Sequence, residues 1–379
     1  MRIADRVARL YAPVVHILAA STFLGWLLFS GVGFRGALLA AVAVLIITCP
    51  CALALAVPVV QVVATGLLLR RGILVKSPDA LERLAQADSI VFDKTGTLTE
   101  GQPRLVDGDA IPSEILRRAA GLAEVSRHPL AQALAASCEG PRPKPVDIVE
   151  TPGAGLSGVV DGRHLRLGSR AFCGVADKAQ SDDRMEIWFR EEDADSRRFV
   201  FADRPRADAR GTIETLKRHG YHVALLSGDR EPVVARIAAV LGIEDWRARC
   251  LPADKVAAIE SMAAQGRRVL MVGDGLNDAP ALAAGFASMS PASASAVSQT
   301  AADLLFQGRL LGPVVFALAV ARRTERLVRQ NFALAVIYNL GAVPIAIAGL
   351  ATPLIAAVAM SSSSLLVTLN ALRLKRLSP

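Results

Sequence analysis

The sequence predicts an α-helical membrane protein that has a cytoplasmic α/β domain between its membrane helices and a second domain inserted into the first. Two observations lead to this fold class. The chain of 379 residues is 52% hydrophobic and only 21% charged, which is too apolar for a soluble enzyme of this size. The apolar residues also gather towards the two ends, whereas the middle of the chain has an ordinary share of charges.

Three long stretches contain no Asp, Glu, Lys or Arg, namely residues 10–34, 36–69 and 330–372. A helix needs about 20 apolar residues to cross a bilayer, so each of the first two stretches holds one crossing and the last holds two. Basic residues flank all four predicted crossings on one side, whereas the other side has Arg35 alone. The positive-inside rule therefore places both termini and the middle of the chain in the cytoplasm.

The net charge of +8 belongs to these flanks, so it indicates a lipid bilayer as partner and excludes nucleic acid. The basic N-terminus has no small-residue cleavage site, so we expect no removable signal peptide. No disulfide pattern is visible among the five cysteines, which favours a reducing compartment. They are Cys49, Cys51, Cys138, Cys173 and Cys250.

The middle of the chain, from Ser77 to about Gly308, alternates short apolar runs with amphipathic stretches, as α/β domains do. The pattern predicts buried strands at residues 89–92, 223–226 and 268–272, and helices at residues 209–218, 231–241 and 255–264. This alternation predicts a parallel sheet that binds ligands at the carboxyl ends of its strands. The segment at roughly residues 104–204 is too long for a loop and predicts an inserted domain.

The predicted organisation therefore has four parts. Residues 1–76 form two membrane helices, residues 77–103 and 205–310 the α/β domain, residues 104–204 the inserted domain, and residues 311–379 two further membrane helices.

A candidate nucleophile follows the first predicted strand. Residues 93–99 read Asp-Lys-Thr-Gly-Thr-Leu-Thr, which places the Asp93 carboxylate at the strand end beside a turn of backbone amides. A carboxylate in this position can attack a phosphoryl group and form an aspartyl-phosphate, provided that cations offset the negative charges that come together.

The other two strands supply partners for this chemistry. Asp274 and Asp278 follow the third strand and offer oxygen ligands suited to magnesium. Ser227, followed by Gly228 and Asp229, comes after the second strand and offers a hydroxyl to a phosphate oxygen. Lys255, near the start of a helix, is the candidate cation.

Together these motifs resemble the phosphoryl-transfer domain of haloacid dehalogenase-like proteins, and the seven-residue motif resembles that of P-type ATPases. The resemblance implies that the catalytic residues are Asp93, Lys94, Thr95, Ser227, Gly228, Asp229 and Lys255. It implies that the magnesium ligands are Asp93, Thr95, Asp274 and Asp278.

A phosphatase of the same fold is the alternative reading. Phosphatases that resemble this fold usually have a second Asp two residues after the nucleophile, where it acts as general acid and base. This chain has Thr95 there. Without that carboxylate the phospho-enzyme persists long enough to drive a conformational cycle, which favours a pump.

The inserted region contains a His-Pro pair, His128-Pro129, at the start of a helical stretch. This pair resembles the nucleotide-binding domain of the heavy-metal (class IB) P-type ATPases, and implies an α+β domain that binds ATP. The resemblance assigns the adenine to His128, with Pro129, and the close approach of the nucleotide to Gly153, Gly155 and Gly168. Two positions depart from the family pattern, since the acidic residue falls at Glu124 and Ser169 replaces the usual Asn.

The second membrane stretch contains Cys49-Pro50-Cys51. Residues two apart on a regular helix point to different faces, so two thiols there would not meet on one ion. Pro50 removes a backbone hydrogen bond and can unwind the helix locally, which lets both cysteines face one cavity. Thiolates are soft ligands that suit Cu(I) and zinc.

The last two crossings narrow the choice of metal. Tyr338 and Asn339 lie in the third crossing, while Met360 and Ser364 lie one helical turn apart in the fourth. A thioether prefers a soft monovalent ion, and no Asp, Glu or Lys lies in either crossing to balance a divalent one. This set resembles the Cu(I) ATPases, with silver as a surrogate, and a zinc or cadmium pump is the alternative.

Finer features resemble a bacterial branch of these pumps that supplies copper for assembly of cbb-type haem-copper oxidases. They are Arg127 before the His-Pro pair, the run of residues 57–71, and Ser227 in place of the usual Thr. The resemblance implies that the protein lies in the inner membrane of a bacterium. It also makes a copper chaperone a candidate partner.

The family also has parts that this sequence lacks: further helices, and an actuator domain whose Thr-Gly-Glu loop dephosphorylates the aspartate. We therefore expect the C-terminal part of a pump, either a truncated gene product or a fragment. Two function classes follow. The chain represents an ATP-driven Cu(I) exporter, or it is a remnant that binds ATP or metal and pairs with a separately encoded N-terminal half.

Overall fold

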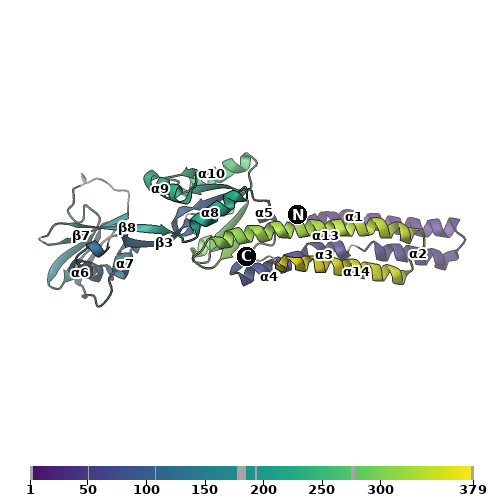
Figure 1. The fold of residues 1–379 in the computed structure, drawn as a ribbon, viewed down its shortest axis with the longest axis horizontal. Helices are drawn as coiled ribbons and strands as arrows, with labels where there is room; N and C mark the ends of the chain where they lie inside the picture. The colour runs from purple at the N-terminus through teal and green to yellow at the C-terminus, as the bar shows by residue number, and fades with distance from the viewer. Residues whose placement is uncertain are drawn as a thin grey trace. The chain divides into compact units, whose positions relative to one another are not determined.

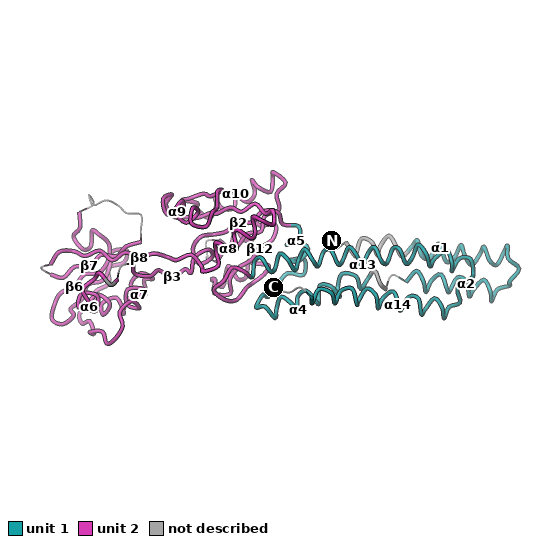
Figure 2. The backbone as a smooth tube through the Cα atoms, viewed as in Figure 1, with its two compact units in different colours: residues 1–86, 313–379 teal, residues 87–312 magenta. Residues whose placement is uncertain are grey.

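The computed structural model describes residues 3–49, 51–106, 108–176, 185–192, 194–274 and 278–376. Figure 1 shows its elements, and Figure 2 shows that they form two compact units. Unit 1 contains residues 1–86 and 313–379, and unit 2 contains residues 87–312.

Unit 1 is helical. Its elements are α1 (Ile3–Phe29), α2 (Gly33–Ile47), α3 (Cys51–Ala56), α4 (Pro58–Arg70), β1 (Ile73–Val75), α5 (Ala80–Gln86), α13 (Gly312–Ile347), α14 (Pro353–Leu372) and η4 (Arg373–Arg376). Small residues make up much of its interior, with Ala43, Ala346 and Ala356 fully buried in one cluster. Small side chains let helices approach closely, which is a feature of packing between membrane helices.

The second apolar stretch of the sequence is broken twice. Its first helix ends at Ile47, where the Thr48 hydroxyl donates a 2.6 Å hydrogen bond to the Val44 carbonyl, and the next begins at Cys51. The second break precedes Pro58, which opens α4 and has no N–H to continue a helix. A stretch that the sequence predicts as one crossing is therefore three short helices.

By length and apolarity, two helices in the described part of the chain could cross a membrane, at Gly312–Ile347 and Pro353–Arg376. The sequence predicts four crossings. Among the residues searched, three shorter apolar helical stretches lie nearer the N-terminus, at Pro13–Phe29, Gly33–Ile47 and Ala54–Arg70.

Unit 2 contains an α/β layer in which strands and helices alternate along the chain. Its parallel strands lie in the order β13-β12-β11-β2-β9-β10. They are β2 (Ser89–Asp93), β9 (His222–Leu226), β10 (Asp245–Arg247), β11 (Val269–Val272), β12 (Ala287–Pro291) and β13 (Leu304–Phe306). The helices are α8 (Ala209–Arg218), α9 (Glu231–Leu241), α10 (Pro252–Ala264), α11 (Ala279–Ala284) and α12 (Ala296–Ala301).

The three strands predicted from the sequence are confirmed to within one residue at each end, and so is their parallel pairing. Predicted helices 209–218 and 231–241 match α8 and α9, and the third starts three residues earlier than predicted, at Pro252. A proline is well placed in the first turn of a helix, where its missing N–H costs nothing.

A second, antiparallel sheet also belongs to unit 2, with strand order β3-β8-β7-β6-β5-β4. Its strands are β3 (Thr99–Val106), β4 (Val146–Thr151), β5 (Gly155–Val160), β6 (Arg163–Gly168), β7 (Met185–Glu191) and β8 (Arg197–Pro205). A short helix η2 (Gly108–Ala110) follows β3, and α6 (Ser113–Ala123) and α7 (Pro129–Ala136) pack on the sheet around Phe189, Phe199 and Phe201. The first and last strands of this segment, β3 and β8, are paired, so the chain enters and leaves the sheet side by side.

Candidate functional site

The candidate nucleophile Asp93 is the last residue of β2, the strand between β9 and β11. All five residues of β2 are buried. Ser227 follows β9 directly, and Gly273 and Asp274 follow β11. Because parallel strands end at one edge of a sheet, residues that are far apart in the sequence meet around Asp93.

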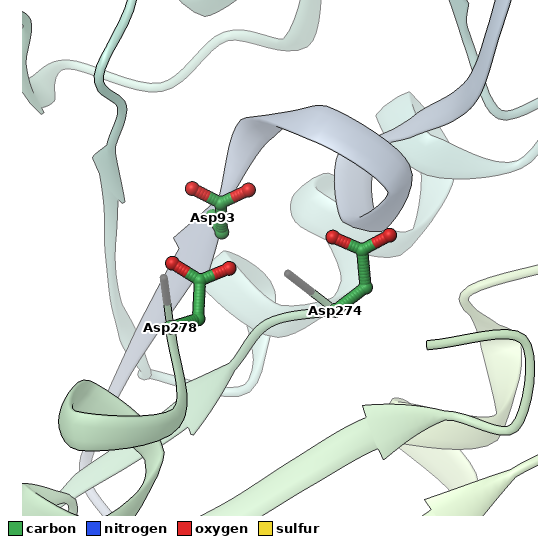
Figure 3. A group of neighbouring side chains, drawn as sticks. All are labelled: Asp93, Asp274 and Asp278. Atoms are coloured by element: carbon green, nitrogen blue, oxygen red, sulfur yellow. The ribbon is translucent and has the colours of Figure 1, made fainter. Parts of the chain in front are cut away.

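Three carboxylates gather at this edge. One oxygen each of Asp93, Asp274 and Asp278 lie within 4.8 Å of one another, and Figure 3 shows the three side chains around a shared space. Asp93 is 5% exposed and Asp278 2% exposed. The Lys255 ammonium donates to the carboxylates of Asp93 and Asp278, each at 2.6 Å.

The local electrostatics follow from this crowding. Burial and the neighbouring Asp278 raise the pKa of Asp93 to about 6, although Lys255 acts in the opposite direction. Burial, Asp93 and Asp278 raise the pKa of Asp274 to about 7. Burial alone would lower the pKa of Lys255, but the two carboxylates outweigh it and raise the pKa above its ordinary value. The negative charge of the carboxylates therefore favours the binding of a further cation at this cluster.

The loop after Asp93 is shaped by Gly96. Its φ is +68°, and a Cβ placed there would lie 1.6 Å from the Asp274 Oδ2. Only glycine combines this left-handed backbone with so close a carboxylate. Gly96 is not among the predicted site residues, although a glycine three residues after a buried strand is a usable signal.

We expect Gly96→Ala to destabilise the protein by about 2–4 kcal/mol, because the added methyl group must push Asp274 aside and strain the backbone. Gly211→Ala is the matched control, since Gly211 lies in α8 with nothing within 4 Å of its Cβ position. That control should gain about 0.5–1 kcal/mol from better helix propensity. Melting temperatures in detergent compare the two, and equal values would contradict the steric role of Gly96.

The other predicted catalytic residues lie around the cluster. Lys94 is buried and forms an ion pair with Asp229. The Ser227 hydroxyl is buried and accepts a 3.2 Å hydrogen bond from the Asp229 N–H, across Gly228. Thr95 is exposed and has an extended backbone in the loop.

Arg206 is a further residue of the site, which no motif in the sequence predicts. It is 5% exposed, its guanidinium donates to the Gly96 and Gly308 carbonyls, and its N–H donates to the Leu98 carbonyl at 2.9 Å. These bonds fix the nucleophile loop from the end of β8. Nearby, the Thr99 hydroxyl donates to Asp203, whose pKa is raised by burial. No local sequence pattern around Arg206 predicts its contacts with the Gly96 and Gly308 carbonyls.

The candidate nucleotide residues lie on the second sheet and its helices. His128 caps the N-terminus of α7, and its Nδ1 accepts a 3.3 Å hydrogen bond from the Leu130 N–H. The ring is exposed, and this bond leaves Nε2 as the nitrogen that bears hydrogen. Pro129 lines a cavity of about 670 Å³ together with Arg104 and Arg204.

The predicted glycines are not alike. Gly155 and Gly168 are paired on β5 and β6, and a Cβ on Gly168 would lie 2.2 Å from the Ala154 carbonyl oxygen. At each of these two positions a side chain would collide with the backbone of the facing segment, so glycine is required there whether or not a ligand binds nearby. Gly153 has a φ of +74° and open space around its Cβ position, so it lies free at a turn.

The predicted metal residues lie in unit 1. Cys49 is in the break after α2, and Cys51 opens α3, with its side chain outside the described part. Tyr338 packs on the cluster that contains Ile47, the last residue of α2. Asn339 has a buried Oδ1 that accepts no hydrogen bond from the described residues.

Met360 and Ser364 are half-buried on α14, between Ala356 and Val367. Ala356 belongs to the same cluster as Ile47, and Val367 belongs to one with Ala56 of α3. Since Ile47 ends α2 and Ala56 ends α3, these clusters place Met360 and Ser364 between the level of the end of α2 and that of the end of α3.

One expectation about the cysteines is wrong. Cys49 is disulfide-bonded in the structure, whereas Cys138, Cys173 and Cys250 are free and buried. Cysteine spacing along the chain carries no information on a bond that depends on where a helix is broken. A thiolate ligand at Cys49 requires prior reduction.

Comparison with known proteins agrees with this geometry. A family model described as haloacid dehalogenase-like hydrolase matches residues 87–285, which is more than half of the chain. The chain belongs to this family.

Relatives within the family are P-type ATPases. Nitrogen fixation protein FixI of Rhizobium meliloti (strain 1021) is 52% identical over 99% of this chain and 49% of its own length. The copper-exporting P-type ATPase of Mycobacterium leprae (strain TN) is 38% identical over 99% of this chain and 50% of its own. The chain spans about half the length of the curated relatives it matches.

A solved structure is similar over nearly all of the chain. It is a crystal structure of a zinc-transporting PIB-type ATPase in the E2.Pi state, with a TM-score of 0.81 and 31% identity, over 99% of this chain and 64% of that one. The resemblance to heavy-metal P-type ATPases that the motifs indicate is thus confirmed.

The acidic cluster of this haloacid dehalogenase-like domain fits magnesium. Mg²⁺ prefers oxygen ligands and usually binds through one or two carboxylates, waters and substrate phosphates. The cluster offers three carboxylates, and the buried Lys255 ammonium contacts two of them, those of Asp93 and Asp278. Gly275, Leu276 and Asn277 lie outside the described part.

Proposed function

We propose that the chain is part of a heavy-metal P-type ATPase that exports Cu(I) across the inner membrane of a bacterium, using ATP and an aspartyl-phosphate intermediate on Asp93. The observation that carries the proposal is the buried Asp93 carboxylate, held at 2.6 Å by Lys255 at the end of a parallel strand. Four crossings, formed by α1, α2 to α4, α13 and α14, hold it in the membrane. A copper chaperone and a separate N-terminal half are candidate partners.

The residues of the site suit phosphoryl transfer. An Asp93 carboxylate oxygen attacks the γ-phosphorus of ATP, the bond to the β,γ-bridging oxygen breaks, and ADP leaves. Lys255 would move towards the developing negative charge from the carboxylates that it now binds. Ser227 can donate its hydroxyl to a phosphate oxygen, while Lys94 and Arg206 hold the loop. Magnesium bound by Asp93, the Thr95 carbonyl, Asp274 and Asp278 would neutralise charge on the phosphates.

The identity of residue 95 supports a slow phospho-enzyme. Thr95 is exposed at the site, and a threonine hydroxyl is too weak a base to activate water. The aspartyl-phosphate therefore needs a group from outside the described residues for rapid hydrolysis. ATP is proposed to bind through His128 and Gly153, with the adenine near the Nε2 of the histidine.

Copper is the proposed cargo for two reasons. The relatives named as copper exporters match the whole chain, and no acidic or lysine residue lies between Arg329 and Arg373 to balance a divalent ion. Cys49, Cys51 and Met360 provide soft sulfur ligands at one level of the bundle. The Asn339 Oδ1, which accepts no hydrogen bond within the described part of the chain, would line the path with Tyr338 and Ser364.

Zinc is the second candidate, because the similar solved structure is named as a zinc-transporting ATPase. Copper is favoured over zinc because the chain is 38% identical to a relative named as a copper exporter and 31% identical to the zinc-transporting structure. Arg127 and Ser227 fit the proposed branch that supplies copper to cbb-type oxidases. A bound-metal measurement separates the two metals on the chain as it is.

We expect the reduced chain in detergent to bind Cu(I) and to retain it against a chelator that removes weakly held copper, whereas Zn(II) is lost. Cys49→Ser should weaken Cu(I) binding by about a hundredfold or more, since it removes a thiolate ligand. Cys138→Ser is the control, because Cys138 is a buried free thiol of unit 2. Tighter retention of Zn(II) than Cu(I), or equal losses in both variants, would contradict copper as cargo.

A further inference from the structure

A cavity of about 300 Å³ in unit 1 is lined almost entirely by arginine. Its lining residues are Ala319, Arg322, Arg323, Arg326, Arg373 and Arg376. The first four lie on α13 and the last two on η4. The volume is at the lower end of the range for small-molecule sites.

Like charges gather around this cavity, which favours a bound anion. Arg323 and Arg326 are three residues apart on α13, a spacing at which like charges share a helix face and repel. Arg373 and Arg376 are three apart on a 3₁₀ helix, where side chains at that spacing eclipse. Every charged side chain among the lining residues is an arginine. Basic residues that serve only solubility or membrane orientation have to flank the crossings, but they do not have to converge on one cavity.

One of these arginines is held in place from inside the bundle. The Arg373 Nη1 donates a 2.9 Å hydrogen bond to the Asn370 Oδ1, and the Asn370 amide donates at 2.9 Å to the Asn331 Oδ1. Asn331 is fully buried and donates in turn to the Ala56 carbonyl at 3.3 Å. This chain of hydrogen bonds orders Arg373 before any ligand arrives, which lowers the entropy cost of binding.

The cavity lies where the uncharged segment of residues 330–372 begins and ends. From Arg329 to Ile347 the helix α13 rises about 27 Å at 1.5 Å per residue, close to the thickness of a bilayer core. The arginines therefore lie at the cytoplasmic boundary of the proposed crossings. This step rests on the membrane position given under the proposed function.

We propose that this cavity binds the phosphate of an anionic phospholipid headgroup from the cytoplasmic leaflet. Guanidinium groups match phosphate oxygens with paired hydrogen bonds, and basic cavities between membrane helices on the cytoplasmic side recognise such headgroups. A lipid phosphate is favoured over a free one because the acyl chains can lie along the apolar surfaces of α13 and α14, where Leu334, Ile337, Leu365 and Leu369 are exposed.

The test compares two double variants that remove the same charge. Arg326→Gln/Arg376→Gln empties the cavity of two cations, whereas Arg70→Gln/Lys375→Gln removes two exposed cations of unit 1 that do not line it. Each full-length chain is reconstituted in vesicles of phosphatidylcholine with an equal part of phosphatidylglycerol, then extracted in mild detergent, and the lipid retained per chain is measured by native mass spectrometry.

We expect wild type and the control double variant to retain phosphatidylglycerol in preference to phosphatidylcholine. In the cavity double variant, the ratio of retained phosphatidylglycerol to retained phosphatidylcholine should fall at least tenfold. Soluble inorganic phosphate should not displace the lipid. Equal losses in both variants would show a diffuse charge effect, and displacement by inorganic phosphate would show a free-anion site; either overturns the proposal. A chain that washes off pure phosphatidylcholine vesicles at alkaline pH would contradict the membrane crossings, whereas one that stays without headgroup preference contradicts this proposal alone.

Discussion

Replacing Lys255 with methionine is expected to destabilise the metal-free protein by about 3–5 kcal/mol at pH 8, because it leaves buried carboxylates without their cation. Asp93 and Asp278 each lie 2.6 Å from the Lys255 ammonium, and both are nearly inaccessible to water. The loss should shrink at pH 5.5, where Asp93, whose pKa burial raises to about 6, takes up a proton. Added Mg²⁺ at pH 8 should restore part of the stability for the same reason.

Lys217→Met is the matched control. The Lys217 ammonium contacts the Gly242 carbonyl at 2.7 Å and Glu244 at 2.8 Å, but this pair is exposed. Exposed ion pairs contribute little to stability, because water screens the charges. Melting temperatures in detergent at the two pH values, with and without Mg²⁺, give the comparison. A loss in Lys255→Met that is no larger than in the control, or that is equal at both pH values, would contradict the charge balance of the site.

Asp93→Asn is expected to abolish phosphorylation from ATP and, at the same time, to stabilise the metal-free protein. The first effect follows because an amide cannot act as the nucleophile. The second follows from the pKa of Asp93, which burial and Asp278 raise to about 6 in the folded protein. An acid with a raised pKa opposes folding when it is ionised, so its removal should add about 1–3 kcal/mol at pH 8.

The sign of this gain can be checked by pH. As the pH falls from about 6 to 4, wild-type Asp93 takes up its proton in the folded state and the advantage of Asn disappears. Asp245→Asn serves as control, since Asp245 lies on β10, the strand beyond β9, and pairs with His222 away from the cluster. Phosphorylation by labelled ATP and melting temperature are measured on the same samples. A variant that loses phosphorylation but also loses stability at pH 8 would refute the electrostatic account of Asp93.

The acidic site was predictable because the topology of a parallel sheet brings its strand ends together. Asp93, Asp274 and Asp278 each follow a run of apolar residues, and recognising those runs as neighbouring strands is enough to place the carboxylates at one edge. The pairing of β2 with β9 and β11 confirms that step. Lys255 was predictable from its position near the start of a helix that follows a strand.

Gly96 and Arg206 show where this reasoning stops. The distance from a glycine Cβ to the Asp274 carboxylate depends on how two loops pack, which no local pattern encodes. Arg206 reaches the Gly96 carbonyl across 110 residues of sequence, after the whole antiparallel sheet has intervened. Such a contact forms only when β8 pairs with β3 and brings Arg206 back to the loop that follows Asp93.

In unit 1 the sequence pattern correctly indicated which segments are apolar helices, but it did not show where those helices are broken. The apolar stretch at 36–69 has the length of one crossing, but Pro50 and Pro58 each remove a backbone donor, and the stretch is divided into α2, α3 and α4. The position of Cys49 in such a break, and its disulfide, depend on local backbone geometry.

Whether Asp93 accepts the γ-phosphoryl group of ATP in a Cu(I)-dependent way decides the proposed function most directly. The reduced chain is incubated with labelled ATP, Mg²⁺ and either Cu(I) or a Cu(I) chelator, quenched in acid, and treated with borohydride, which converts a phosphorylated aspartate to homoserine. We expect acid-stable, hydroxylamine-sensitive label only with Cu(I), and homoserine at position 93. Label at another residue, or none under conditions that label an intact P-type ATPase, would contradict the proposal.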